Sequence, residues 1–241
     1  MLEASGFVCC RDAVDDRALA RLLGACAPIA GLERSRSRSG ATYGIRGLLW
    51  SSTRLRFELE TSGVSALAQS FLGAAFPIDA IFFDKQLDAN WSVPGHQDRL
   101  MPIETGTGVP KTIRNDVAYA EPSTETLGEL VVLRVHFDAV GPDDGALEVV
   151  PGSHRRGVLE TDAIRAVPLS DYRPCVVGRG DVLVLRPLLL HRSGRRASAG
   201  HRRVLHIVYA ATQPSDGPRW KALPHSGLQQ TPPSPSLGRR S

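Results

Sequence analysis

Residues 130–138 read LVVLRVHFD, and this stretch decides the fold class. Alternate residues from Val131 to Phe137 are apolar, whereas the residues between them, from Arg134 onward, are polar. Successive side chains of a strand point to opposite faces, so the pattern predicts a strand with one apolar and one polar face. The polar face is too hydrophilic for a dry core. It must contact either bulk solvent or a wet, functional interior.

The segments around this strand extend the same interpretation. Other short apolar runs, separated by turn sequences such as GPDDG and GRGD, are typical of strands. They lie at residues 79–85, 145–150, 174–178, 181–186 and 203–210. Residues 15–27 and 62–72 instead have helical periodicity, with Gly73 ending the second helix. A helical N-terminal section followed by many short strands favours a sandwich or barrel over a βαβ sheet.

Length and composition give the expected domain organisation. The 241 residues suit one domain at 1–212, followed by a Pro/Ser-rich, partly disordered tail at 213–241. No stretch approaches the ~18–20 apolar residues of a membrane helix. The first residues, MLEASGFVCC, do not have the pattern of a secretory signal. The four cysteines have no regular spacing, so we expect a cytoplasmic protein without structural disulfides.

The net charge of +4 raises the question of a nucleic-acid partner. The main basic run, RSRSRS at 34–39, contains no aromatic residue that would stack on bases. We therefore expect a solvated basic loop and no nucleic-acid partner.

Two pairs of residues are candidate metal ligands. GHQDR at 95–99 places His96 and Asp98 two residues apart, and His136 and Asp138 have the same spacing. Pro and Gly in the preceding SVPG sequence interrupt regular strand pairing, and so let the chain present the first pair at the open end of a barrel. The second pair lies within a regular strand. We therefore expect His96 and Asp98 to be ligands and His136 at most to line the pocket.

A third ligand and a cation follow in the segment 180–210. His191 ends an apolar run, and Arg202 comes eleven residues later. A mononuclear non-haem iron oxygenase binds its metal through two histidines and one carboxylate, leaving three coordination sites open. A bidentate 2-oxo acid fills two of these sites and dioxygen the last. The distal carboxylate of the 2-oxo acid then needs a fixed cation, for which a guanidinium is well suited. His96, Asp98, His191 and Arg202 supply this set.

These residues and their surroundings resemble the phytanoyl-CoA dioxygenase family of iron(II)/2-oxoglutarate-dependent oxygenases. The matching segments are FDKQLDANWSVPGHQD, LRVHFDAVGPDDGALEVVPGSHRRG and residues 180–210, which together span most of 80–211. The resemblance implies a mainly β fold with flanking helices, a double-stranded β-helix (a cupin-like jelly roll) that holds Fe(II) at its open end. It also implies that Ser193 and Arg134 bind 2-oxoglutarate together with Arg202.

The implied reaction is oxidation, most simply hydroxylation, of an aliphatic C–H bond in a small organic molecule. It consumes O2 and 2-oxoglutarate and releases succinate and CO2. Halogenating relatives lack the carboxylate ligand, so Asp98 implies oxygen chemistry. Gly95 replaces an aromatic residue of close relatives and predicts a more open pocket. Nothing resembles a coenzyme A site, so the substrate is not implied.

Two other questions stay open in the sequence. The main alternative to an enzyme is a non-catalytic jelly-roll module that binds or regulates. Among the remaining polar residues, His206 is expected to support the ligands or to lie in the core. Lys85 is expected to form either an ion pair or a substrate contact.

Overall fold

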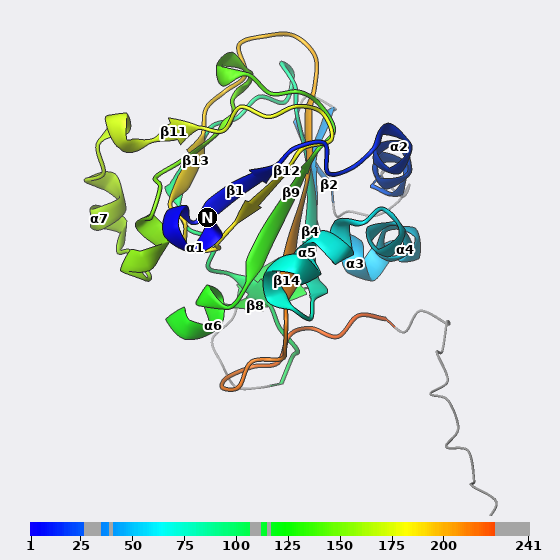
Figure 1. Cartoon of the computed structure of the whole chain (residues 1–241), viewed down its shortest axis with the longest axis vertical. Helices are drawn as coiled ribbons and strands as arrows, with labels where there is room; N and C mark the ends of the chain where they lie inside the picture. The colour runs from blue at the N-terminus through cyan, green and yellow to red at the C-terminus, as the bar shows by residue number, and fades with distance from the viewer. Residues whose placement is uncertain (27–34, 39–40, 107–111, 115–116, 225–241) are drawn as a thin grey trace, which may run out of the picture.

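The computed structural model describes residues 1–26, 35–38, 41–106, 112–114 and 117–224 (Figure 1). Its largest element is a seven-stranded antiparallel sheet. In spatial order its strands are β1 (Phe7–Cys10), β12 (Val182–Leu185), β9 (Val131–His136), β14 (Arg202–Ala210), β4 (Phe76–Lys85), β3 (Ala41–Ile45) and β2 (Ser35–Arg38). The central strands β9 and β14 carry the alternating pattern that the sequence predicts.

Two smaller antiparallel sheets complete the β structure. The four-stranded sheet has the order β11 (Arg173–Pro174), β10 (Leu147–Val149), β13 (His191–Ser193) and β5 (Val93–His96). The three-stranded sheet has the order β6 (Met101–Pro102), β8 (Val117–Ala120) and β7 (Thr112–Arg114). The predicted fold class, a mainly β jelly roll with flanking helices, is confirmed.

Helices cover the outer face of the seven-stranded sheet (Figure 1). They are α2 (Asp16–Ala25), α3 (Leu48–Ser51), α4 (Thr53–Thr61) and α5 (Val64–Leu72). Leu133, Leu205 and Ile207 project from the sheet into the core beneath them, and each is fully buried. Short helices elsewhere are α1 (Leu2–Ser5), α6 (Thr124–Gly128), α7 (Thr161–Arg165), and the 3-10 turns η1 (Pro142–Asp144), η2 (Ser153–Arg156) and η3 (Leu169–Asp171).

Both predicted helices form, and local chemistry accounts for their ends. The Asp15 carboxylate caps α2 by accepting from the amide of Ala18 at 2.7 Å, as an N-cap acid should. Helix α5 ends at Gly73, which adopts a φ of 80° that a residue with a side chain rarely takes. The sequence did not predict α4, whose apolar periodicity is weaker than that of α2 or α5.

The inner face of the seven-stranded sheet is divided along its length. At one end Val132 of β9 and Val208 of β14 join a second apolar core with strands of the smaller sheets. Further along the same two strands, Arg134 and His206 take the equivalent inward positions, and both are buried. The interior is therefore apolar at one end and polar at the other.

Several segments differ from the sequence-based expectations. The predicted strand at 174–178 is wrong for most of its length. Strand β11 ends at Pro174, and Val177 forms an isolated bridge with Val140. Strand β1, which the sequence did not identify, pairs along β12 from Phe7 opposite Leu185.

The segment after residue 212 is anchored to the domain at Trp220. Trp220 is 1% exposed, forms a bridge with Ile103 and donates its indole N–H to the carbonyl of Thr212. Residues 225–241 of the predicted tail lie outside the described residues, so the division at 212 stays a prediction. None of the helices in the described ranges reaches the length and hydropathy of a membrane span.

The packing of β14 against the helices gives a stability prediction. Leu205→Ala removes a fully buried side chain from the core beneath the helices, so we expect it to lower the free energy of unfolding by about 2–5 kcal/mol. Leu169→Ala is the matched control, because Leu169 is 72% exposed, and we expect a change within about 0.5 kcal/mol. Urea unfolding of the three proteins measures both values. Equal effects of the two substitutions would contradict this packing.

Candidate functional site

The candidate site forms where two strands of the four-stranded sheet pair. Strand β5 is antiparallel to β13, and His96 lies directly opposite His191 in this pairing. The register shifts before Ser193, which pairs with Val93, so the strands are irregular next to the histidines. Beyond β5, the amide of Asp98 donates to the carbonyl of Pro187 at 2.9 Å. The chain therefore brings all three predicted metal ligands to one end of the sheet.

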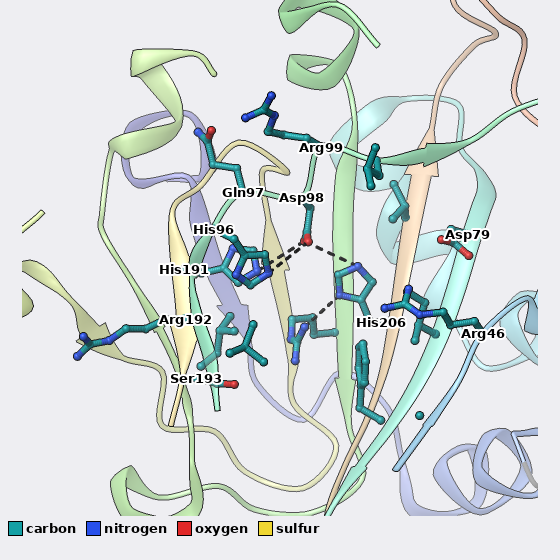
Figure 2. A pocket seen from close by; sticks show the side chains of 18 of the residues that line it. Arg46, Asp79, His96, Gln97, Asp98, Arg99, His191, Arg192, Ser193 and His206 are labelled. Atoms are coloured by element: carbon teal, nitrogen blue, oxygen red, sulfur yellow. Dashed lines mark hydrogen bonds and ion pairs between the residues drawn. The ribbon is translucent and has the colours of Figure 1, made fainter. Parts of the chain in front are cut away.

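The three side chains converge on a common point (Figure 2). Nε2 of His96 lies 3.8 Å from Oδ1 of Asp98, and Nε2 of His191 lies 3.7 Å from Oδ2 of the same carboxylate. The two imidazole centroids are 4.2 Å apart. All three ligand atoms lie within 4.8 Å of one another. This spacing suits three donors around one metal ion.

Backbone carbonyls fix the orientation of both imidazoles. Nδ1 of His96 lies 2.9 Å from the carbonyl of Pro94, and Nδ1 of His191 lies 2.9 Å from that of Leu189. A carbonyl can only accept, so Nδ1 carries the proton in each ring, and the lone pair of Nε2 faces the centre. Metal-binding histidines are commonly held in this way.

Gln97, between the two ligands of the first pair, anchors the loop. Its amide nitrogen donates to the carbonyls of Leu188 and Gly157 at 2.7 and 2.9 Å. Its amide oxygen accepts from the amide of Leu159 at 2.8 Å. The bond to Leu188 ties the first ligand pair to the chain that leads into His191, and the other two bonds tie it to the segment 157–159. The sequence analysis missed this role, because the bonding partners are far away in the chain.

The charge state of the cluster also suits a metal ion. Burial opposes ionisation of Asp98, but the nearby imidazoles, above all that of His191, outweigh it and lower the pKa of the carboxyl to about 2. Burial lowers the pKa of His191 to about 4. At neutral pH the cluster therefore offers an ionised carboxylate and a neutral imidazole, the forms that bind metals. Oδ2 of Asp98 is buried without a hydrogen-bond partner among the described residues, which fits an oxygen atom that would coordinate a metal ion.

His206 lies next to the carboxylate of Asp98, where it can support the ligands as expected from the sequence. Its Nε2 is 3.9 Å from Oδ2 of Asp98, and its Nδ1 is 3.0 Å from Nη1 of Arg134. A guanidinium can only donate, so Nδ1 accepts and Nε2 carries the proton that faces Asp98. Burial lowers the pKa of His206 to about 3, which keeps the ring neutral.

Three buried cations lie beside the histidine–carboxylate cluster. Lys85 is fully buried, and its ammonium donates to the carbonyl of Gly194 at 2.6 Å and to Oγ of Ser193 at 3.3 Å. Arg202 is 3% exposed and donates to the carbonyl of Gly145 at 2.5 Å, while its Nε has no hydrogen-bond partner among the described residues. Arg134 is the third cation.

The mutual effect of these cations appears in their pKa values. Burial lowers the pKa of Arg202 to about 9, and repulsion by Arg134 adds to the effect. Burial, then Arg202 and Arg134, lowers the pKa of Lys85 to about 7. Unpaired buried cations are costly, so this end of the interior is suited to an anionic ligand.

The competing ligand pair is not brought together. Asp138 accepts from the guanidinium of Arg203 at 2.6 and 3.0 Å, and so is already paired away from the cluster. His136 is buried, and it is not among the residues that line the cavity beside the cluster. His136 therefore lies outside both the cluster and the cavity, within the expectation that it would at most line the pocket. In the pairing of β9 with β14, His136 lies opposite Val204, two residues beyond Arg134 along β9.

The expectation of a more open pocket at Gly95 is wrong. A Cβ at this position would come within 2.5 Å of the Tyr172 hydroxyl and 3.3 Å of Ile164. Tyr172 itself packs under the guanidinium of Arg192, 4.1 Å from the ring centroid. Because His96 faces the cluster, residue 95 faces the other side of the strand, where Tyr172 fills the space.

The cluster opens into a cavity of about 920 Å³. His96, Asp98 and His191 line it, and so do the predicted 2-oxoglutarate contacts Arg134, Ser193 and Arg202. Its far side, away from the histidine pair, is formed partly by Arg46 and Asp79 (Figure 2). The sequence analysis did not identify this second group of polar residues.

Comparisons with known proteins agree with this geometry. The family model described as phytanoyl-CoA dioxygenase (PhyH) matches residues 2–204. A search of curated proteins found no match.

Solved structures share the fold at low sequence identity. AviO1 from Streptomyces viridochromogenes Tue57 is 24% identical, with a TM-score of 0.63 over 90% of this chain and 94% of that one. The epimerase SnoN from nogalamycin biosynthesis, in complex with Fe3+, alpha ketoglutarate and nogalamycin RO, is 18% identical, with a TM-score of 0.64 over 94% and 93%. EctD from S. alaskensis with 2-oxoglutarate and 5-hydroxyectoine is 17% identical, with a TM-score of 0.66 over 87% and 73%.

The two candidate histidines can be separated by metal content. We expect His96→Ala to lose most of its bound iron, because the variant keeps only two of the three converging donors. His136→Ala is the control, and we expect it to keep iron, since its ring lies outside the cluster. Iron per chain is measured after anaerobic reconstitution, with circular dichroism to check folding. Loss of iron in the second variant alone would show that the wrong pair has been assigned.

Proposed function

The chain belongs to the phytanoyl-CoA dioxygenase family of iron- and 2-oxoglutarate-dependent enzymes, and from that premise we propose how its site works. We propose that His96, Asp98 and His191 bind Fe(II) and that the neighbouring cations bind 2-oxoglutarate. The observation that carries the proposal is the convergence of two imidazoles and one ionised carboxylate next to three buried cationic side chains. Two histidines and one carboxylate are the ligand set of non-haem iron oxygenases.

The cations explain how a dicarboxylate would be held. 2-Oxoglutarate has two negatively charged carboxylates. One would bind the metal, and the other would pair with the guanidinium of Arg202. The hydroxyl of Ser193 and the ammonium of Lys85 lie on the same side of the interior, bonded to each other at 3.3 Å. Arg134 would hold the imidazole of His206 in place by donating to its Nδ1. A bound dianion would offset the repulsion among the cations, which supports this assignment.

We propose that the reaction is oxidation, most simply hydroxylation, of an aliphatic C–H bond in a small organic molecule. When bound, iron(II) with 2-oxoglutarate and O2 supplies the oxidising power, and succinate and CO2 are released. The protein positions the substrate in the cavity and excludes bulk water from the buried end. Asp98 supplies a carboxylate ligand, which favours oxygen chemistry over halogenation. The structural neighbours include an epimerase and a carbocyclase, and so related folds direct such an oxidant to other outcomes.

The alternative is a jelly-roll module that binds or regulates without catalysis. The complete set of three converging donors and a buried Arg202 argues against it. Succinate formation from 2-oxoglutarate by the iron-loaded protein separates the two, because a binding module forms none. We further propose a cytoplasmic location for the enzyme, as its cysteine usage suggests.

Arg202 gives the most direct prediction for the co-substrate. We expect Arg202→Ala to weaken 2-oxoglutarate binding by roughly 10- to 100-fold, because a charged, partly desolvated hydrogen-bond pair is lost. Arg203→Ala is the matched control: Arg203 pairs with Asp138 and should leave co-substrate affinity unchanged. Isothermal titration with 2-oxoglutarate under anaerobic conditions measures both variants, with iron content as the check on the metal site. Unchanged affinity in Arg202→Ala would move the cation role to another residue.

Lys85 makes co-substrate binding depend on pH. Burial, then Arg202 and Arg134, lowers the pKa of Lys85 to about 7, so a large fraction of the Lys85 side chains is uncharged just above pH 7. A bound dianion raises this pKa, so above pH 7 binding takes up a proton and affinity falls as pH rises, by up to about tenfold per pH unit. We expect Lys85→Met to bind more weakly and to lose this slope. The same slope in both proteins, measured by titration at a series of pH values, would assign the proton to another group.

A further inference from the structure

The wall of the cavity opposite the histidine pair contains a carboxylate that the iron and 2-oxoglutarate sites do not use. Asp79 lies on β4, where the register with β14 shifts: Val208 is opposite Asp79, and Tyr209 is opposite Pro77. Ile78 is thus an extra residue in β4, which is a β-bulge. Bulges commonly redirect a side chain next to a functional site.

The bulge places an acid inside the protein. Ile78 packs in the apolar core between the sheets, and the next residue, Asp79, lines the cavity. In regular pairing two consecutive side chains point to opposite faces. After the bulge the alternation resumes, since Ala80 and Phe82 pack under the helices on the outer face. Regular pairing would have turned either Ile78 or Asp79 to the outer face.

Asp79 is buried and only partly bonded. It is 3% exposed, and Oδ2 accepts from the hydroxyl of Tyr119 at 3.3 Å. Oδ1 has no hydrogen-bond partner among the described residues. Burial raises the pKa of Asp79 to about 6, although the guanidinium of Arg46 favours the charged form. A buried carboxylate oxygen without a partner is costly, so its retention on a cavity wall calls for a ligand that donates to it.

The charges around Asp79 restrict what that ligand can be. Arg46 and Arg114 both act on Tyr119 electrostatically, so two cations already lie near this wall and disfavour an ammonium group. The carboxylate itself disfavours an anion. Tyr119 uses its only proton on Asp79, which leaves its oxygen as a second acceptor. The terminal torsion of a carboxylate is soft, so either oxygen can be presented to the cavity.

We propose that Asp79, held by Tyr119, determines substrate specificity by accepting a hydrogen bond from a neutral hydroxyl group of the substrate. The inference rests on the proposed function, because it treats this cavity as the space beside the iron where the substrate binds. The substrate is then a hydroxylated molecule that is uncharged where it meets Asp79. A site built around a buried acceptor discriminates strongly against analogues that lack the donor.

The test uses three six-membered-ring probes of similar size. They are myo-inositol, which is neutral and hydroxylated, cyclohexylamine, which is cationic, and cyclohexanecarboxylate, which is anionic. Each is titrated against the full-length, iron-loaded protein under anaerobic conditions, with and without 2-oxoglutarate, and the midpoint of thermal unfolding is measured. A ligand that binds only the folded protein raises this midpoint.

Of the three probes, we expect only myo-inositol to stabilise the wild-type protein that already holds 2-oxoglutarate. Asp79→Leu should weaken the apparent affinity for myo-inositol by roughly 10- to 100-fold, the effect of one hydrogen bond to a charged group. Asp79→Asn, which keeps the shape, serves if the leucine variant does not fold. Asp84→Asn is the matched control, because Asp84 lies on the same strand but pairs with His201. We expect it to behave as wild type.

Each other result has a defined meaning. With 2-oxoglutarate bound, stabilisation by cyclohexylamine or by cyclohexanecarboxylate instead of myo-inositol would overturn the neutral-hydroxyl assignment. No stabilisation by any probe, or equal stabilisation by myo-inositol of wild type and both Asp79 variants, would overturn the role of Asp79. The 2-oxoglutarate arm is independent of these results. If 2-oxoglutarate fails to stabilise the iron-loaded wild type, the proposed function fails, whatever the probes do.

Discussion

The antiparallel pairing of β5 with β13 is the contact on which the rest of the site depends. It places His96 opposite His191, although the two residues are 95 positions apart in the chain. The carbonyl bonds of the two rings and the three bonds of Gln97 then fix the geometry around that pair. The ligand positions are therefore set by the backbone of the jelly roll, as a pre-organised metal site requires.

The same fold buries three cationic side chains whose burial does not by itself stabilise the folded protein. Lys85, Arg134 and Arg202 are all buried on the inner face of the sheet, next to an apolar core that continues along the same strands. Burial lowers the pKa of all three side chains, and repulsion from neighbouring cations lowers the pKa of Lys85 and Arg202 further; both effects oppose folding. A dianionic co-substrate offsets these costs, so co-substrate binding and stability of the fold are expected to be coupled.

The sequence predicted the parts of the molecule that are controlled locally. Alternation in 130–138 identified β9, and helical periodicity with Asp15 and Gly73 as end signals identified α2 and α5. The sequence also singled out His96, Asp98 and His191, which converge in the structure, because the chemistry of a mononuclear iron site restricts both residue types and order; their role as ligands stays a proposal. In each of these cases the signal lies within a few residues or in one well-defined chemical requirement.

The remaining features depend on contacts between distant segments. Residues 174–178 have only a weak strand pattern, and of these residues only Pro174 belongs to a named strand. Strand β1 forms because it can pair with the edge of β12. Position 95 was misjudged because Tyr172, far along the chain, fills the space beside it. The redirection of Asp79 depends on a one-residue shift against β14, which has no signature in β4 itself. Such features follow from tertiary pairing and not from local pattern.

A crystal structure of the protein with Fe(II) and 2-oxoglutarate is the most direct test of this metal site. The crystals are grown without oxygen, and diffraction data are recorded at the iron absorption edge. We expect one anomalous peak between His96, Asp98 and His191, with 2-oxoglutarate bound to the same metal and its far carboxylate on Arg202. An iron peak at another set of residues, or 2-oxoglutarate bound away from Arg202, would contradict this expectation.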